Sequence, residues 1–178
     1  MKITLNSLLK TAMLVTLGIV LPMAFHAFGW SGRVFLPMHI PVLLAGFLLG
    51  PLPGVIAGAT TPLLSSVLTG MPPMAPMPIA LQMSIELSAF GLLAGIFLNS
   101  LKLNIVLSLV LTLAGGRLAL GLTTMALFPL LGLPAVPLTV IFGASLVTAL
   151  PGLVLQIIAI PPIVLAMKKY NMLKHLGA

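Results

Sequence analysis

The sequence predicts an all-α integral membrane protein, in which a single domain (residues 1–178) forms six transmembrane helices with both termini in the cytoplasm. Of the 178 residues, 60% are hydrophobic and 5% are charged, whereas a soluble domain carries about a quarter charged residues. Since about 20 residues cross a bilayer, the apolar runs of this chain are enough for about six crossings. A soluble domain is therefore excluded, and so is a disordered chain, which requires low hydrophobicity.

The first three spans are expected at about residues 8–28, 38–50 and 55–68. The first is either a cleaved signal peptide or a retained helix, and Lys10 and the bulky Phe25 favour a retained helix. The other two are short for a full crossing, which indicates helices that are tilted, bent or shielded by protein. The Gly50–Gly54 segment between them contains two glycines and two prolines and predicts a turn.

The last three spans are expected at about residues 79–98, 105–128 and 138–167, with a bend in the last near Pro151 or Pro161–Pro162. The preceding segment, Gly70–Pro78, contains four prolines in nine residues and cannot form a helix. We therefore expect an irregular, Met-rich loop there, and a second Gly/Pro-rich loop at residues 129–137.

The basic residues predict the orientation. Six lysines fall on the side that holds both termini: Lys2, Lys10, Lys102, Lys168, Lys169 and Lys174. The other side holds Arg33 alone. Because the excess of Lys and Arg lies on the cytoplasmic side, we expect a multi-pass membrane protein with both termini in the cytoplasm and the lipid bilayer as its solvent. No nucleic-acid partner is expected, since the basic residues sit at the ends of apolar runs and not on one wetted face.

Several function classes are disfavoured. The sequence has no cysteine, so a thiolate nucleophile and a Cys-type zinc site are excluded. It also has no Gly-rich phosphate-binding loop followed by Lys, so hydrolysis of ATP would require a partner. An intramembrane enzyme needs a nucleophile with a base, or a metal cluster, and we expect neither catalysis nor a bound cofactor or metal. A stand-alone secondary carrier or channel remains an alternative, although no clear internal repeat supports it. A membrane enzyme or assembly factor is the other alternative.

Two ionisable residues are expected inside the bilayer. Glu86, the sole acidic residue, lies about eight positions into the fourth span, or roughly 12 Å deep, and Arg117 lies roughly 16 Å deep in the fifth. Ionisable groups at such depth are candidates for a functional site. The two could pair with each other, either as a structural link between helices or as the floor of a cavity, and the two roles can coexist.

Three more residues are candidates for ligand contact. Gln82 precedes Glu86 by four positions and so shares its helical face. His39 opens the second span, where it either contacts a ligand or caps a neighbouring carbonyl. Arg33, beside Trp30 in the first outer loop, is either a grip for a planar or anionic ligand or an anchor at the headgroups.

Two further groups of residues suggest roles. Met71, Met74 and Met77 in the Pro-rich loop suit either a soft metal or, as we favour because prolines separate them, a flexible apolar lid over a ligand. On the first span, Ala12 and Thr16 form a narrow face of small residues that another helix could pack against, in this chain or in a partner.

Several stretches together carry a family resemblance: Leu36-Pro37-Met38-His39-Ile40-Pro41-Val42 through Gly50-Pro51, Thr61-Pro62-Leu63-Leu64-Ser65-Ser66, Thr69-Gly70-Met71-Pro72-Pro73-Met74, and Glu86-Leu87. With the six basic-ended spans, the chain resembles the substrate-binding S component of an energy-coupling factor (ECF) transporter. The resemblance implies high-affinity uptake of a vitamin or related micronutrient from outside. It also implies docking on a coupling module of one membrane subunit and two ATPase subunits, followed by toppling in the membrane.

The resemblance also implies which residues act. Family members commonly dock through Ala-x-x-x-Ala in the first helix, which here is matched by Ala12 with Thr16 in place of the second alanine. We expect a substrate pocket formed by Arg33, His39, Gln82, Glu86 and Arg117 and capped by the Met71–Met77 loop. Its mixed charges suit a zwitterionic or carboxylate-bearing cargo. Haem is the alternative cargo, with His39 or a loop methionine as axial ligand and Arg33 on a propionate.

Overall fold

The computed structural model describes residues 4–29, 32–134, 136–137 and 139–176, with side chains outside the description at 32, 33, 144 and 171–176. Every regular element among them is helical. The elements are α1 (Leu5–Ala27), α2 (Gly32–Phe35), α3 (His39–Leu49), α4 (Pro51–Thr69), α5 (Ile79–Gly95), the π-helix η1 (Ile96–Ser100), α6 (Ile105–Leu130), the π-helix η2 (Thr139–Ala144) and α7 (Ser145–Leu176).

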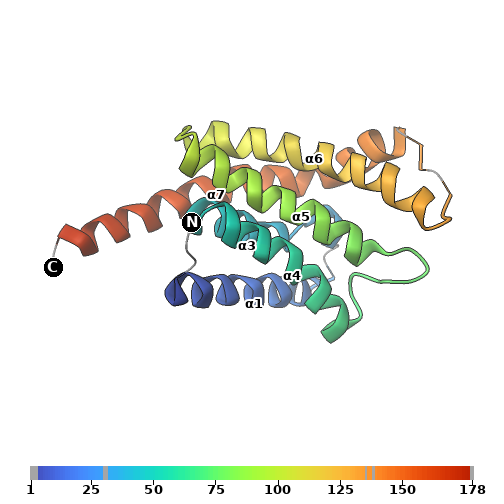
Figure 1. The fold of residues 1–178 in the computed structure, drawn as a ribbon, viewed down its shortest axis with the longest axis horizontal. Helices are drawn as coiled ribbons and strands as arrows, with labels where there is room; N and C mark the ends of the chain where they lie inside the picture. The colour runs from blue at the N-terminus through green and yellow to red at the C-terminus, as the bar shows by residue number, and fades with distance from the viewer. Residues whose placement is uncertain (1–3, 30–31, 135, 138, 177–178) are drawn as a thin grey trace.

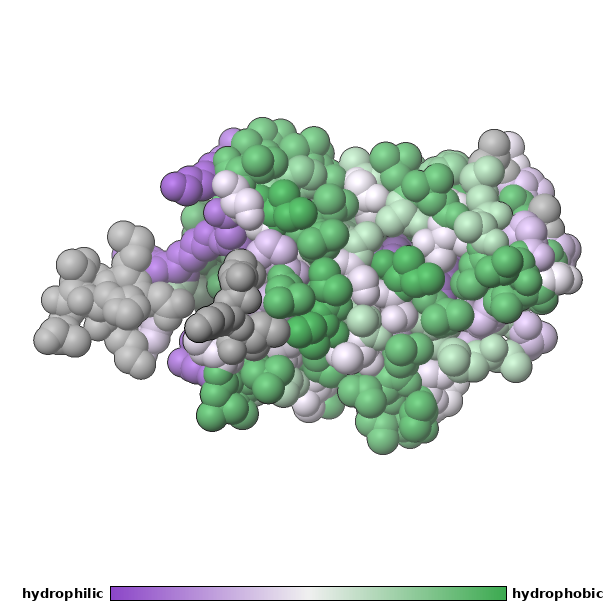
Figure 2. Space-filling view, viewed as in Figure 1, coloured by the Kyte–Doolittle hydropathy of each residue, from purple (hydrophilic) through white to green (hydrophobic). Residues whose placement is uncertain are grey.

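The helices form one elongated bundle with two distinct ends (Figure 1). The start of α1, the Leu101–Asn104 turn and the end of α7 lie at one end, which we call the lysine end because Lys102, Lys168 and Lys169 belong to these segments. The Gly70–Pro78 loop lies at the opposite end, which we call the loop end. On the face shown in Figure 2, hydrophobic side chains dominate and strongly hydrophilic ones gather where α7 emerges.

The described part of the chain confirms the predicted membrane fold. Five of its helical segments are long and apolar enough to cross a membrane: Leu5–Ala27, Pro51–Thr69, Ile79–Ser100, Ile105–Leu130 and Thr139–Tyr170. The second predicted span, at about residues 38–50, corresponds to α3, which has 11 residues and so extends about 16 Å, roughly half the hydrocarbon thickness. Seven consecutive residues of α3, Pro41 to Phe47, are buried, so protein shields this short helix as the sequence suggested.

Three predicted boundaries were wrong, and proline accounts for two of them. The turn expected at Gly50–Gly54 is Gly50 alone (φ 105°), because Pro51 and Pro53 occupy the first turn of α4, where no backbone N–H is needed. Helix α6 continues through Pro129 to Leu130, since a proline in the last turn removes only one helical hydrogen bond. Helix α7 extends to Leu176, past the expected end at residue 167.

Helices α3, α4 and α5 are packed backbone to backbone. A Cβ added at Gly91 would lie 2.2 Å from the carbonyl oxygen of Gly54, and one at Gly54 would lie 2.3 Å from the carbonyl oxygen of Gly91. Small residues let helices approach this closely in a membrane. At the lysine end the Asn99 amide donates to the carbonyls of Gly46 (3.1 Å) and Phe47 (3.2 Å), near the end of α3. This contact links α3 to η1, the π-helix that continues α5.

A cluster of buried apolar side chains brings α3, α5, α6 and α7 together. Its buried members include Leu43, Phe90, Leu109, Leu113 and Ile160. Gln156 precedes Ile160 by one helical turn and is fully buried, and neither its Nε2 nor its Oε1 has a hydrogen-bond partner. A buried amide without partners destabilises the fold that contains it.

We therefore expect Gln156→Leu to raise the free energy of unfolding by about 1–2 kcal/mol, because an unpaired buried polar group carries its full desolvation penalty. Thr112→Val is the control: Thr112 is also fully buried, but its hydroxyl donates to the Ser108 carbonyl at 2.7 Å. Thermal unfolding in detergent compares the two variants. A loss of stability in Gln156→Leu would show that the Gln156 amide does not destabilise the fold.

Candidate functional site

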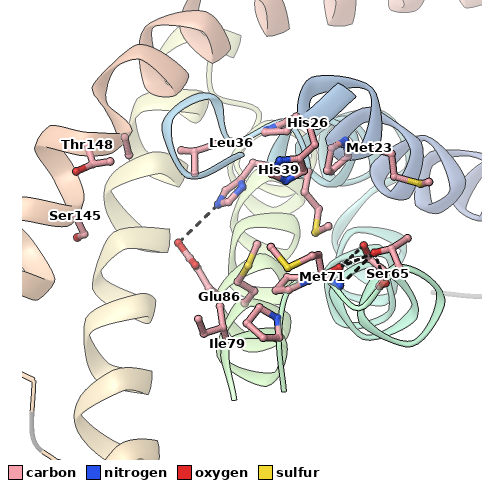
Figure 3. A pocket seen from close by; sticks show the side chains of 18 of the residues that line it. Met23, His26, Leu36, His39, Ser65, Met71, Ile79, Glu86, Ser145 and Thr148 are labelled. Carbon is pink, nitrogen blue, oxygen red and sulfur yellow. Dashed lines mark hydrogen bonds and ion pairs between the residues drawn. The ribbon is translucent and has the colours of Figure 1, made fainter. Parts of the chain in front are cut away.

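A cavity of about 640 Å³ lies near the loop end, since Met71, Pro72 and Pro73 of the Gly70–Pro78 loop are among its lining residues (Figure 3). Residues of α1, α3, α4, α5, α6, η2 and α7 line it, together with the turn before α3 and the start of the Pro-rich loop. The lining includes Met23, His26, His39, Ser65, Thr69, Met71, Ile79, Met83, Glu86, Arg117, Ser145 and Thr148. Its size is within the usual range of small-molecule sites, about 300–1,000 Å³.

Three ionisable residues from three helices meet at this wall. The Oε1 atom of Glu86 lies 3.7 Å from Nε2 of His39 and 3.5 Å from Nη1 of Arg117. The side chains of His39, Glu86 and Arg117 are 3%, 5% and 14% exposed. Figure 3 shows Glu86 and His39 pointing toward each other. We call these three residues the charged cluster.

The backbone explains how His39 reaches this position. Leu36 adopts a left-handed conformation (φ 51°), and its carbonyl accepts a hydrogen bond from the His39 amide at 3.1 Å. This turn starts α3 at His39, so the imidazole enters the bundle at the first residue of the helix. The ring of Phe90, one turn after Glu86 on α5, meets the imidazole edge-on with 5.2 Å between centroids. His39 is thereby held between α5 and the cavity.

The charged cluster has polar atoms without hydrogen-bond partners. They are Nδ1 and Nε2 of His39, Oε1 of Glu86, and Nε and Nη2 of Arg117. The two Glu86 contacts are longer than a charge-assisted hydrogen bond, about 2.7–2.9 Å. Buried polar groups are normally paired, and a set that remains unpaired on a cavity wall is available to a ligand. Glu86 of α5 and Arg117 of α6 thus lie close to each other and also line the cavity.

The Pro-rich loop is attached to α4 at its first methionine. The carbonyl of Met71 accepts hydrogen bonds from Ser65 Oγ (2.7 Å) and Thr69 Oγ1 (3.1 Å), and Thr69 Oγ1 accepts one from the Met71 amide. Met71 lines the cavity. Met74 and Met77 are 52% and 40% exposed and lie farther along the loop, outside the lining.

The other predicted site residues are placed differently. Gln82 donates to Thr124 Oγ1 at 2.6 Å, which links α5 to α6, and it is not among the residues that line the cavity. The side chain of Arg33, like Trp30, lies outside the described residues. On α1, Ala12 and Thr16 are exposed, and the Thr16 hydroxyl donates to the Ala12 carbonyl at 3.0 Å. Substrate contact by Gln82 and Arg33 stays a prediction.

Several lining residues were not predicted from the sequence. Met23, His26 and Met83 lie on the cavity wall. Ser145 and Thr148 of α7 also line it. Their hydropathy gives no signal, because the cavity is formed by helix ends that are distant in the sequence. Only the tertiary packing brings α1, α5 and α7 around one space.

The fold and cavity define a multi-pass membrane protein with a small-molecule-sized chamber at one end. The family model of the ECF transporter substrate-specific component matches residues 6–164. The chain belongs to this family and is therefore a subunit of a membrane transporter, which confirms the resemblance drawn from its motifs. No curated protein and no solved structure gives a significant match.

Proposed function

We propose that this subunit captures a vitamin or related micronutrient at the loop end, on the outer face of the cytoplasmic membrane of a prokaryote, and delivers it to the lysine end in the cytoplasm. The observation that carries the proposal is the charged cluster, whose unpaired atoms lie on the wall of a 640 Å³ cavity. His39, Glu86 and Arg117 would hold the substrate, with Arg33 and Gln82 as predicted additional contacts. The loop through Met71, Met74 and Met77 would close over it, and closure would exclude water.

Energy for uptake would come from an ECF transmembrane coupling subunit and two ATPase subunits, since this chain has no phosphate-binding motif of its own. The exposed Ala12 and Thr16 support α1 as the docking helix. The Thr16 hydroxyl donates a hydrogen bond within its own helix, so it needs no partner from another helix. This face is therefore narrow and suited to close helix packing in a membrane.

Co-purification tests the proposal. We expect the tagged chain, isolated from a host that expresses the coupling module, to retain the coupling subunit and both ATPases. Ala12→Trp should abolish this retention, whereas Ile158→Trp, at a 67% exposed position of α7, should preserve it. Uptake into vesicles that contain this chain alone would contradict the proposal and support a stand-alone carrier.

A further inference from the structure

The charged cluster contains more hydrogen-bond donors than acceptors. A guanidinium carries five N–H donors and no acceptor. In Arg117 only Nη1 faces Glu86, at 3.5 Å, while Nε and Nη2 have no partner. His39 supplies at least one further N–H, and neither of its nitrogens has a hydrogen-bond partner. The Glu86 carboxylate does not meet this demand, because its Oε1 atom is the oxygen facing both bases, at 3.7 Å and 3.5 Å, and forms a hydrogen bond with neither.

Three hydroxyl side chains on the cavity wall, those of Ser65, Thr69 and Ser145, are already engaged. The hydroxyls of Ser65 and Thr69 donate to the Met71 carbonyl, and the Ser145 hydroxyl donates to the Ile141 carbonyl. Among the buried, described side chains of the lining, the polar atoms without hydrogen-bond partners all belong to the charged cluster. Much of the remaining described lining is apolar, including Met23, Met38, Ile79 and Met83. Methionine side chains adapt to the shape of an apolar ligand.

We propose that the substrate is an amphipathic carboxylic acid, with its carboxylate received by Arg117 beside His39 and its apolar body lying against the methionines. This inference rests on the proposed function and narrows its substrate class. A carboxylate supplies two acceptor oxygens, which match the planar guanidinium. A ligand with a cationic head group would place that charge beside the guanidinium of Arg117, which repels it. A polyol or a diphosphate would place polar groups against the apolar wall, where they lack hydrogen-bond partners.

Fractions of a natural extract test this chemistry directly. The purified chain in detergent is mixed with yeast extract and with three fractions of it, and thermal unfolding is followed for each. Extraction into ethyl acetate at about pH 2 and back into water at about pH 8 isolates apolar-bodied carboxylic acids, since carboxyl groups titrate near pH 4. Amines and phosphates stay in the first aqueous phase, and neutral compounds stay in the organic phase.

We expect the whole extract and the acid fraction to raise the unfolding temperature, and the other two fractions to leave it unchanged. Stabilisation by the neutral or the aqueous fraction alone would overturn the carboxylate inference and leave the proposed function standing. If neither the whole extract nor any fraction stabilises the chain, the inference and the proposed function both fail.

Variants link the result to the cluster. Arg117→Gln should weaken apparent affinity for the acid fraction by about tenfold or more, since a hydrogen bond to a charged group is worth more than a neutral one. Lys169→Gln, at an exposed position of the lysine end, should bind as the wild type does. If Arg117→Gln does not fold, the double variant Glu86→Gln/Arg117→Gln removes both charges and should show the same loss. Unchanged affinity in the folded variant would overturn the role of Arg117.

Discussion

Replacing Glu86 with Gln is expected to lower the free energy of unfolding by about 3 kcal/mol, because it leaves the Arg117 guanidinium buried without its carboxylate. In the wild type the two side chains are 5% and 14% exposed and their nearest atoms are 3.5 Å apart. Gln keeps the volume of Glu, so the loss reports the charge and not a cavity. Denaturant-induced unfolding in detergent measures it.

A double-mutant cycle separates this effect from general damage. We expect Glu86→Gln/Arg117→Met to be more stable than the sum of the two single variants predicts, with a coupling energy of about 1–3 kcal/mol. The control, Lys169→Met at an exposed position, should change stability by less than about 0.5 kcal/mol. Purely additive losses would show that the two residues do not interact and that they do not link α5 to α6.

Replacing Gly91 with Ala is the second change with a large expected effect. The added methyl group would lie 2.2 Å from the carbonyl oxygen of Gly54 and 2.3 Å from its carbonyl carbon. These are backbone atoms, so relief requires α4 and α5 to move apart. We expect a loss of about 3 kcal/mol in the free energy of unfolding, at the upper end of the usual cost of overpacking.

Ligand binding should weaken together with stability in Gly91→Ala, since Glu86 stands on the displaced helix. The matched control is Gly143→Ala, because no atom lies within 4 Å of a Cβ built at Gly143. Unfolding temperature and binding of the stabilising extract fraction are measured for both variants. Wild-type behaviour of Gly91→Ala would contradict the backbone-to-backbone packing of α4 and α5.

Each of the six predicted spans corresponds to a helix among the described residues, so most helix positions were predictable from hydropathy, whereas the short α2 was not predicted. The loop at Gly70–Pro78 was also predictable, because so many prolines exclude a helix. The turn at Gly50–Gly54 was overestimated since a proline in the first helical turn looks in the sequence like a helix breaker. The helix through Pro129 was missed for the related reason that one lost hydrogen bond near a helix end is tolerated.

The candidate site was predictable only in part. Counting residues from the span ends placed Glu86 and Arg117 at similar depths, and the structure places them 3.5 Å apart. The four-residue spacing between Gln82 and Glu86 places both on one helical face and favoured Gln82 as a ligand contact. In the structure the Gln82 amide donates to Thr124 of α6. His39 was a candidate by position alone, and its contact with Glu86 required the height and rotation of α3.

The sequence by itself determined that this protein is an integral membrane protein with several transmembrane helices, and that it has one intramembrane carboxylate, which requires an ion-pair or hydrogen-bond partner. Scarcity of charge and the length of the apolar runs decide these points, and neither depends on packing. Tertiary structure alone decided which residues surround the cavity and that His39, Glu86 and Arg117 converge. Those features depend on how closely the helices approach each other and on how each helix is rotated about its axis. Close contacts between glycines of different helices, such as Gly54 with Gly91, set this geometry, and the sequence does not reveal which glycines meet.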